Sequence, residues 1–181
     1  PDRWLEPLTG PVTGYRGKAR LGVKYVDAKG DTLVGFREKR NSLIADLAQC
    51  EVLIPEVGHR FRDLRALING LDCRRRLPQI EVARGDDAVA LVFRHLDPLS
   101  PADQDALVAF CRENGLQCYL QPGNESTVHR VWPEEGEERL YYRHPQADVE
   151  MAFHPSDFTQ VNAEINRRMV PLALDLLEVE A

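Results

Sequence analysis

Residues 15–26 alternate between apolar and basic side chains, and this alternation constrains the fold more than any other stretch. The apolar positions, which would share one face, are Tyr15, Ala19, Leu21, Val23 and Tyr25. The basic positions, which would share the other, are Arg16, Lys18, Arg20 and Lys24. A period of two is typical of a β-strand with one buried face. Turn residues 27–31 and the run 32–37 then predict a hairpin partner.

The remaining periodic segments predict an α+β fold with a mainly antiparallel sheet and two to three covering helices. A helix is expected from Pro55 to Leu71, and another begins at Ser100, a good N-cap followed by Pro101 at the first helical position. Gly115 stands where a helix commonly ends. Further strands are expected at residues 79–84, 88–93, 116–121, 127–132, 140–143 and 149–153. The order therefore begins ββαββα and ends in a last helix.

That last helix follows an extended segment that starts near His154. Asn162 is a favourable N-cap, and Glu164 lies in the first turn, where the helix dipole favours an anion. We therefore expect the side chains of Phe158 and Gln160 to project from a strand-to-helix junction, a place where side chains often meet ligands. Pro171 is expected to kink the helix.

Charge is distributed unevenly along the chain. Residues 1–76 hold 15 Lys/Arg against 10 Asp/Glu, whereas residues 77–181 hold 8 against 19. Such asymmetry predicts one part that faces nucleic acid and one that does not. The basic strand face is equally consistent with an ordinary solvated surface, so both interpretations stay open. Hydrophobic residues make up 43% of the chain, as in globular proteins.

Several classes of protein are excluded by what the sequence lacks. It has no membrane-spanning apolar run and no signal peptide, which predicts a cytoplasmic protein without membrane contact. It has no dinucleotide fingerprint, P-loop or nucleophile elbow, so no catalytic residue is predicted. The first residue is not methionine, which predicts a piece of a longer protein.

The four cysteines do not have the spacing of a zinc site or a C-x-x-C pair. They are Cys50, Cys73, Cys111 and Cys118. Spacing alone predicts small buried side chains in a reducing compartment rather than metal ligands or disulfides.

Four short motifs, in order, resemble RNA uracil-C5 methyltransferases, above all the bacterial iron–sulfur enzymes that act on 23S rRNA. They are Y-R-G-K-A-R from Tyr15, G-F-R from Gly35, Q-C-E-V-L from Gln49, and F-x-Q-x-N from Phe158. The resemblance implies that residues 1–157 form the central α+β domain, associated with RNA and the cluster. Residues 158–181 would be the junction and first helix of a Rossmann-like methyltransferase domain whose remainder is missing here.

The resemblance also assigns roles to individual residues. It implies that Gln160 contacts S-adenosylmethionine, that Phe158 lies near the target base, and that Cys50 is the fourth ligand of a 4Fe-4S cluster whose other ligands lie upstream. Independently of the resemblance, the basic strand face predicts that Arg16, Lys18 and Arg20 contact the RNA. The implied reaction adds a cysteine thiolate to C6 of a flipped-out uracil, after which C5 takes the methyl group. Neither that cysteine nor the base that removes the C5 proton is in this chain.

The intact protein would thus use S-adenosylmethionine and a 4Fe-4S cluster to form 5-methyluridine in 23S ribosomal RNA, as a monomer. The chain alone would be inactive and free of both cofactors. The alternative is a stand-alone RNA-binding or protein-interaction module without chemistry. The basic strand supports that alternative, and the acidic second half counts against it.

Overall fold

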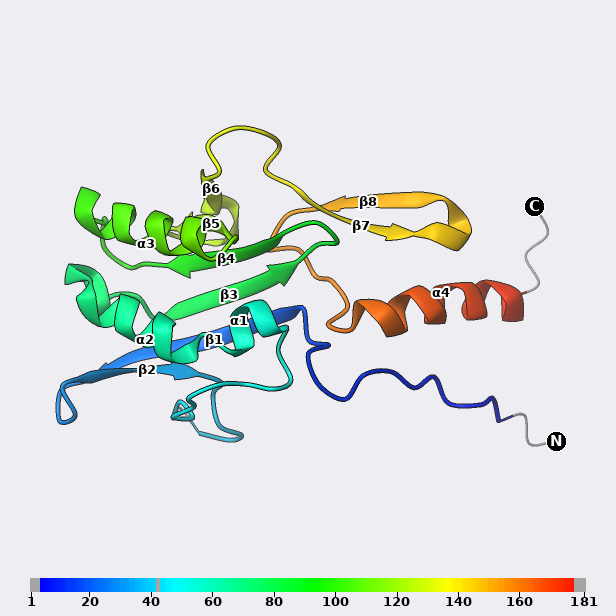
Figure 1. The fold of residues 1–181 in the computed structure, drawn as a ribbon, viewed down its shortest axis with the longest axis horizontal. Coiled ribbons are helices and arrows are strands. Elements are labelled where there is room, and N and C mark those ends of the chain that lie inside the picture. Colours follow the sequence, from blue (N-terminus) through cyan, green and yellow to red (C-terminus); the bar gives the residue numbers. More distant parts are fainter. Residues whose placement is uncertain (1–3, 42, 178–181) are drawn as a thin grey trace.

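The structure, a computed structural model, describes residues 4–41 and 43–177, and a six-stranded sheet forms its centre (Figure 1). The strands are β1 (Lys18–Val26), β2 (Asp31–Gly35), β3 (Gln79–Arg84), β4 (Val89–Arg94), β5 (Gln117–Gln121) and β6 (His129–Trp132). Their order in the sheet is β2-β1-β3-β4-β5-β6. Every pair is antiparallel except β4 and β5, which are parallel. The predicted α+β fold with a mainly antiparallel sheet is confirmed.

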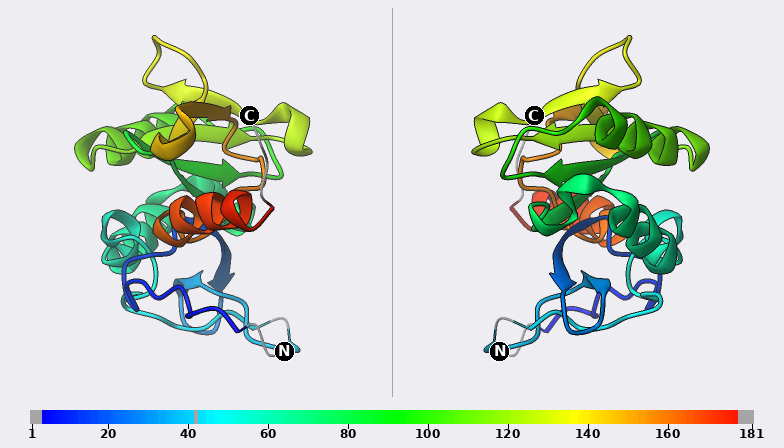
Figure 2. Two further views of the ribbon diagram at one scale, coloured as in Figure 1. Left: turned by 90° about the vertical axis from the view of Figure 1, so that its right-hand side faces the viewer. Right: turned by 90° about the vertical axis from the view of Figure 1, so that its left-hand side faces the viewer.

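Two helices, α2 (Phe61–Gly70) and α3 (Pro101–Glu113), cover one face of this sheet (Figure 2). The alternation that predicted β1 has the expected result, because Ala19, Leu21 and Val23 are buried beneath the helices. Helix α3 connects β4 to β5, which explains their parallel pairing, since parallel neighbours need a crossover connection. Its cap is as predicted, with Ser100 Oγ accepting a hydrogen bond from Asp103 N at 3.1 Å.

The helix predicted from Pro55 to Leu71 is instead two helices, and this part of the prediction is wrong. A short helix, α1 (Pro55–Gly58), ends before α2 begins. Gly58 lies against the backbone of Cys50, whose N–H donates to the Gly58 carbonyl at 2.8 Å. A Cβ on Gly58 would overlap the Cys50 carbonyl oxygen. The helix therefore breaks where the chain packs backbone against backbone, a contact that sequence periodicity does not reveal.

The second half of the chain adds a hairpin and a last helix at one end of the sheet. Strands β7 (Leu140–His144) and β8 (Val149–Phe153) pair only with each other, and α4 (Ala163–Leu177) extends beside them (Figure 1). Three short 3-10 turns complete the described elements: η1 (Asp72–Arg75), η2 (Glu125–Thr127) and η3 (Pro145–Ala147). Pro171 lies within α4 rather than at its end. Among the described residues, no helix is long and apolar enough to cross a bilayer.

Candidate functional site

The junction between β8 and α4 is held by local hydrogen bonds. His154 N donates to Asp157 Oδ2 at 2.7 Å, and Asp157 N donates to the His154 carbonyl at 2.8 Å, which closes a tight turn. Asn162 Oδ1 accepts from Ile165 N at 3.0 Å, so the predicted N-cap is confirmed. The segment from turn to cap is consequently fixed at both ends.

Between these two ends, Phe158 and Gln160 are exposed, and Phe158 keeps 85% of its surface accessible. Gln160 lines a cavity of about 530 Å³ between the first turn of α4, the segment around Gly14 and the β3–β4 turn. Both residues therefore lie where the junction motif predicted them, pointing away from the core.

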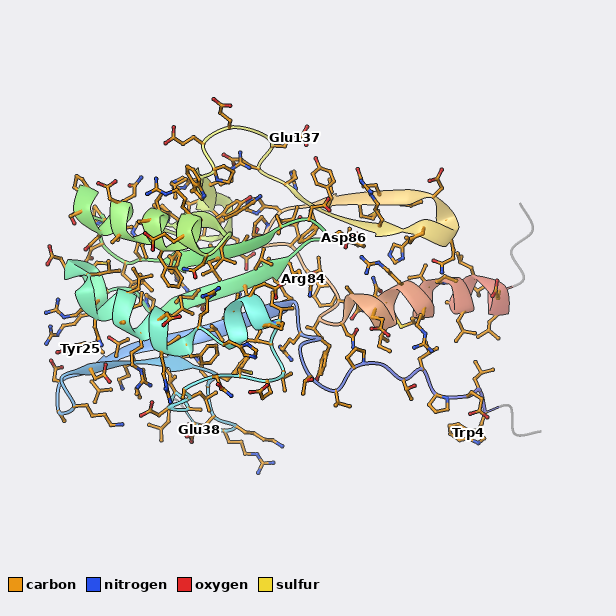
Figure 3. The ribbon with its side chains drawn as sticks, in the orientation of Figure 1. Trp4, Tyr25, Glu38, Arg84, Asp86 and Glu137 are labelled. Carbon is orange, nitrogen blue, oxygen red and sulfur yellow. The ribbon has the colours of Figure 1, made fainter. Side chains whose placement is uncertain are left out.

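The β3–β4 turn, where Arg84 and Asp86 are found (Figure 3), also lines this cavity. Asp86 accepts a hydrogen bond from the guanidinium of Arg167 on α4 and another from Arg143 N at 3.0 Å. The sequence analysis missed this anchor, because it joins residues 81 positions apart. The ion pair between Asp86 and Arg167 thus ties together two of the elements that line the cavity.

The three basic residues predicted to meet RNA have different surroundings. Arg20 keeps 61% of its side chain exposed and contacts the buried carboxylate of Glu81, with Nη2 to Oε1 at 2.9 Å. Lys18 is half-buried and donates to the Pro155 carbonyl of the junction. Burial lowers the pKa of the Lys18 ammonium below its ordinary value of 10.5, and the Glu81 carboxylate opposes that shift.

Arg16 links the strand to the junction through its backbone. It forms isolated bridges with Leu53 and with Asn162, and its guanidinium lies 5.8 Å from the ring centroid of Phe36. Of the three cations, Arg20 therefore presents the most open charge. Arg16 and Lys18 also connect β1 to the junction between β8 and α4.

Cys50, the predicted cluster ligand, is half-buried and packs against the main core. Cys111 and Cys118 are buried, and burial raises the pKa of the Cys73 thiol to about 12. Within residues 4–41 and 43–177, no three His, Cys, Asp or Glu residues gather as a metal site. The described residues alone therefore do not fit a four-thiolate cluster. Cys50 remains a predicted single ligand.

Comparison with known proteins decides the relationship that the motifs indicated. No protein-family model matches the chain. A curated 23S rRNA (uracil(1939)-C(5))-methyltransferase RlmD from Alcanivorax borkumensis is 74% identical over 179 residues, which are 99% of this chain. Throughout its length, the chain is similar to part of an RNA uracil-C5 methyltransferase. A second curated enzyme of the same name, from Alkalilimnicola ehrlichii, is 55% identical over 99% of the chain. The predicted family resemblance is confirmed.

The chain spans about 40% of the length of these curated family members. A solved structure, the Pyrococcus abyssi tRNA (uracil-54, C5)-methyltransferase in complex with S-adenosyl-L-homocysteine, superimposes with a TM-score of 0.66. It is 20% identical, and the match covers 94% of this chain and 43% of that chain. At this identity the likeness concerns the fold. The fold is therefore shared with part of a larger methyltransferase.

Proposed function

We propose that this chain forms part of an S-adenosylmethionine-dependent 23S rRNA uracil-C5 methyltransferase. The observation that carries the proposal is the 74% identity to a curated enzyme of that name across 99% of the chain. That similarity favours this function over a stand-alone binding module. The chain itself contributes no catalytic residue and is expected to be inactive alone.

In this proposal the junction faces the reacting groups. S-adenosylmethionine supplies the methyl group, and the structural neighbour was solved with its demethylated product. The amide of Gln160 both donates and accepts hydrogen bonds, which suits the polar groups of that cofactor. The exposed ring of Phe158 suits contact with an unstacked uracil. The hydrogen-bonded turn and cap on either side hold the backbone of the segment that carries both side chains.

The test of the proposed function uses the full-length protein and 23S rRNA transcripts labelled with tritium at C5 of uracil. Methylation at C5 displaces that hydrogen, so tritium should enter the water only when S-adenosylmethionine is present. The control is a transcript in which the candidate uracils are cytosines. Tritium release without the cofactor, or no release with folded protein, would contradict the proposal.

The basic residues of β1 are proposed to contact the RNA backbone. Each neutralised phosphate of a single strand contributes a slope of about −0.7 in log affinity against log salt. Changing Arg16, Lys18 and Arg20 together to Ala should weaken binding and flatten this slope. Arg20→Ala alone should retain most of the stability, because its guanidinium is the most exposed of the three. An unaltered slope in the triple variant would mean that this face is only solvated.

We also propose that Cys50 is one thiolate ligand of a 4Fe-4S cluster in the intact protein. Because the described residues gather no further ligands, the chain alone is expected to stay free of iron. Anaerobic reconstitution followed by iron analysis and a visible spectrum checks this. Broad cluster absorption from the chain alone would contradict it.

The remaining proposals concern domain boundaries, cellular localisation and oligomeric state. Residues 1–157 are proposed as the central domain and 158–181 as the start of the methyltransferase domain, of which 178–181 lie outside the described residues. We further propose a cytoplasmic, monomeric protein without membrane contact, consistent with its rRNA substrate.

A further inference from the structure

The face of the sheet opposite α2 and α3 carries a row of polar side chains across three strands. The register places Gln79 beside Arg94, and Arg94 beside Gln121. Their neighbours along the chain, including Ile80 and Phe93, point to the helix-covered core, so this row faces the other way. η2 follows β5 on this open side (Figure 2).

Side chains of this row, with the adjacent pair Arg20 and Glu81 and the loop 123–126, line a cavity of about 480 Å³. Some of the polar side chains that line the cavity already hydrogen-bond to one another. Glu81 accepts from Arg20 Nε at 3.1 Å and from Gln79 Nε2 at 2.8 Å. Both bonds reach Oε1, so this one carboxylate oxygen joins two walls of the cavity.

Two other groups in the cavity wall have no partner among the described residues. Gln121 is only 5% exposed, yet its Oε1 accepts no hydrogen bond. The Nε of Arg94 is also buried without an acceptor. Burying an unpaired polar atom is unfavourable, and such atoms are uncommon in native structures. An acceptor and a donor on adjacent strands are thus left for a ligand.

The chemistry of these groups selects the ligand. A phosphate accepts hydrogen bonds but does not donate to Gln121 Oε1, and the carboxylates of Glu81 and Glu125 would repel it. A guanine base matches both groups, since its O6 and N7 accept from an arginine fork and its ring N–H and amino group donate. Unpaired bases are the usual target of sequence-specific RNA recognition.

We propose that this cavity binds one unpaired guanine of the RNA substrate, with Arg94 on the acceptor edge and Gln121 Oε1 on the donor groups. The inference rests on the proposed function only for the identity of the partner as RNA. The proposed site would add a base-specific contact on the face of the central sheet opposite α2 and α3. It is separate from the cavity lined by Gln160.

The experiment measures fluorescence anisotropy of the chain with the labelled RNA heptamer UUUGUUU at one fixed salt concentration. Comparison heptamers carry adenine or inosine at the central position. The guanine heptamer should bind about tenfold tighter than the adenine one, the scale of a good arginine–base pair. Inosine lacks the amino group and should be intermediate. Equal affinity for guanine and adenine would overturn the proposal.

Unlabelled guanosine monophosphate separates RNA from a free nucleotide as the source of the base. It should compete more effectively than adenosine monophosphate but far less than the heptamer, because the heptamer adds backbone contacts. If the mononucleotide competes as well as the heptamer, the cavity is a nucleotide site and the assignment to RNA is wrong.

Two variants test the named atoms. Gln121→Leu should reduce the guanine preference and leave the melting temperature equal or higher, because it removes an unpaired buried oxygen. Arg94→Lys keeps the charge but loses the planar fork, so it should reduce the preference while largely preserving affinity for the adenine heptamer. Gln146→Leu, on the exposed η3 turn, is the matched control and should change neither. An intact preference in both cavity variants would overturn the proposal.

The guanine site and the proposed function can be rejected independently of each other. Methylation by the full-length protein together with no guanine preference would reject the guanine site alone. A guanine preference that both cavity variants reduce, in a protein that methylates no uracil of 23S rRNA, would reject the proposed function alone.

Discussion

Asp86, on the turn between β3 and β4 (Figure 3), pairs with Arg167 on the last helix and so fixes the start of α4 against the central sheet. The other carboxylate oxygen of Asp86 accepts from Arg143 N at 3.0 Å, and Arg167 Nε donates to the Arg143 carbonyl at 3.1 Å. One turn, one strand and one helix therefore meet at a single carboxylate. This arrangement forms one wall of the cavity that contains Gln160.

Asp86→Ala should loosen α4 without unfolding the sheet. The carboxylate is only 25% exposed, and its loss leaves Arg143 N and Arg167 Nη2 without the acceptor that they share. We expect a decrease of about 1–2 kcal/mol in the free energy of unfolding. Limited proteolysis should cut within residues 154–177 before the sheet unfolds. Asp87→Ala, in the same turn, is the control. Global unfolding without early cleavage at the junction would contradict this role.

Gly58→Ala adds only one methyl group, yet it should lower the stability of the chain substantially. Its Cβ would overlap the Cys50 carbonyl and lie 3.2 Å from the Leu53 Cβ, so backbone must move. The expected loss is about 1–3 kcal/mol in chemical denaturation, the usual cost of overpacking. Gly70→Ala provides a matched control, because nothing lies within 4 Å of its added Cβ and Ala favours the helix. Equal stability of the two variants would contradict the close packing.

Local sequence signals predicted the elements of this fold well. The alternation of β1, the Ser100 cap of α3 and the Asn162 cap of α4 all depend on residues within a few positions of one another. Such interactions are visible in a sequence because their geometry is set by the local backbone. The break at Gly58 was missed because its cause is a contact with Cys50, in another segment.

The other features that the sequence did not predict depend on which strands pair and in which register. Arg20 lies opposite Glu81 only because β1 pairs with β3, which turns a predicted free cation into one side of an ion pair. Likewise Gln121 joins Arg94 through the parallel pairing of β5 with β4. The polar residues of these strands fit a period of two, so their common face was predictable. Their meeting in one cavity was not, because strand order is a property of the whole sheet.

Acidification should destabilise the chain through His154. Its half-buried ring stands edge-on to Tyr119, with centroids 6.0 Å apart, and its Nδ1 lies 2.7 Å from Ser156 Oγ. Burial lowers the pKa of His154 below its ordinary value of 6.5, and the Asp157 carboxylate opposes this. The unfolded chain therefore binds more protons in the window below pH 6.5. Stability should fall as the pH drops through that window toward the folded-state pKa.

The measurement for His154 is the melting temperature between pH 7.5 and 5.0 for the wild type and for His154→Gln, which cannot titrate there. The difference between the two should change only below about pH 6.5, with the wild type losing more stability on acidification. Parallel pH profiles for the two proteins would assign the acid sensitivity to other groups.

Gln160→Ala separates a ligand contact from a scaffold role at the junction. The side chain is exposed and lines the cavity between α4 and the β3–β4 turn, so its loss should leave the melting temperature of this chain nearly unchanged. In the full-length protein the same change should weaken S-adenosylmethionine binding by about 1–3 kcal/mol, the cost of an unsatisfied buried partner. Calorimetric titration of the cofactor checks this, with Gln146→Ala as the surface control. Marked destabilisation of the chain with unchanged cofactor affinity would show that Gln160 only supports the turn.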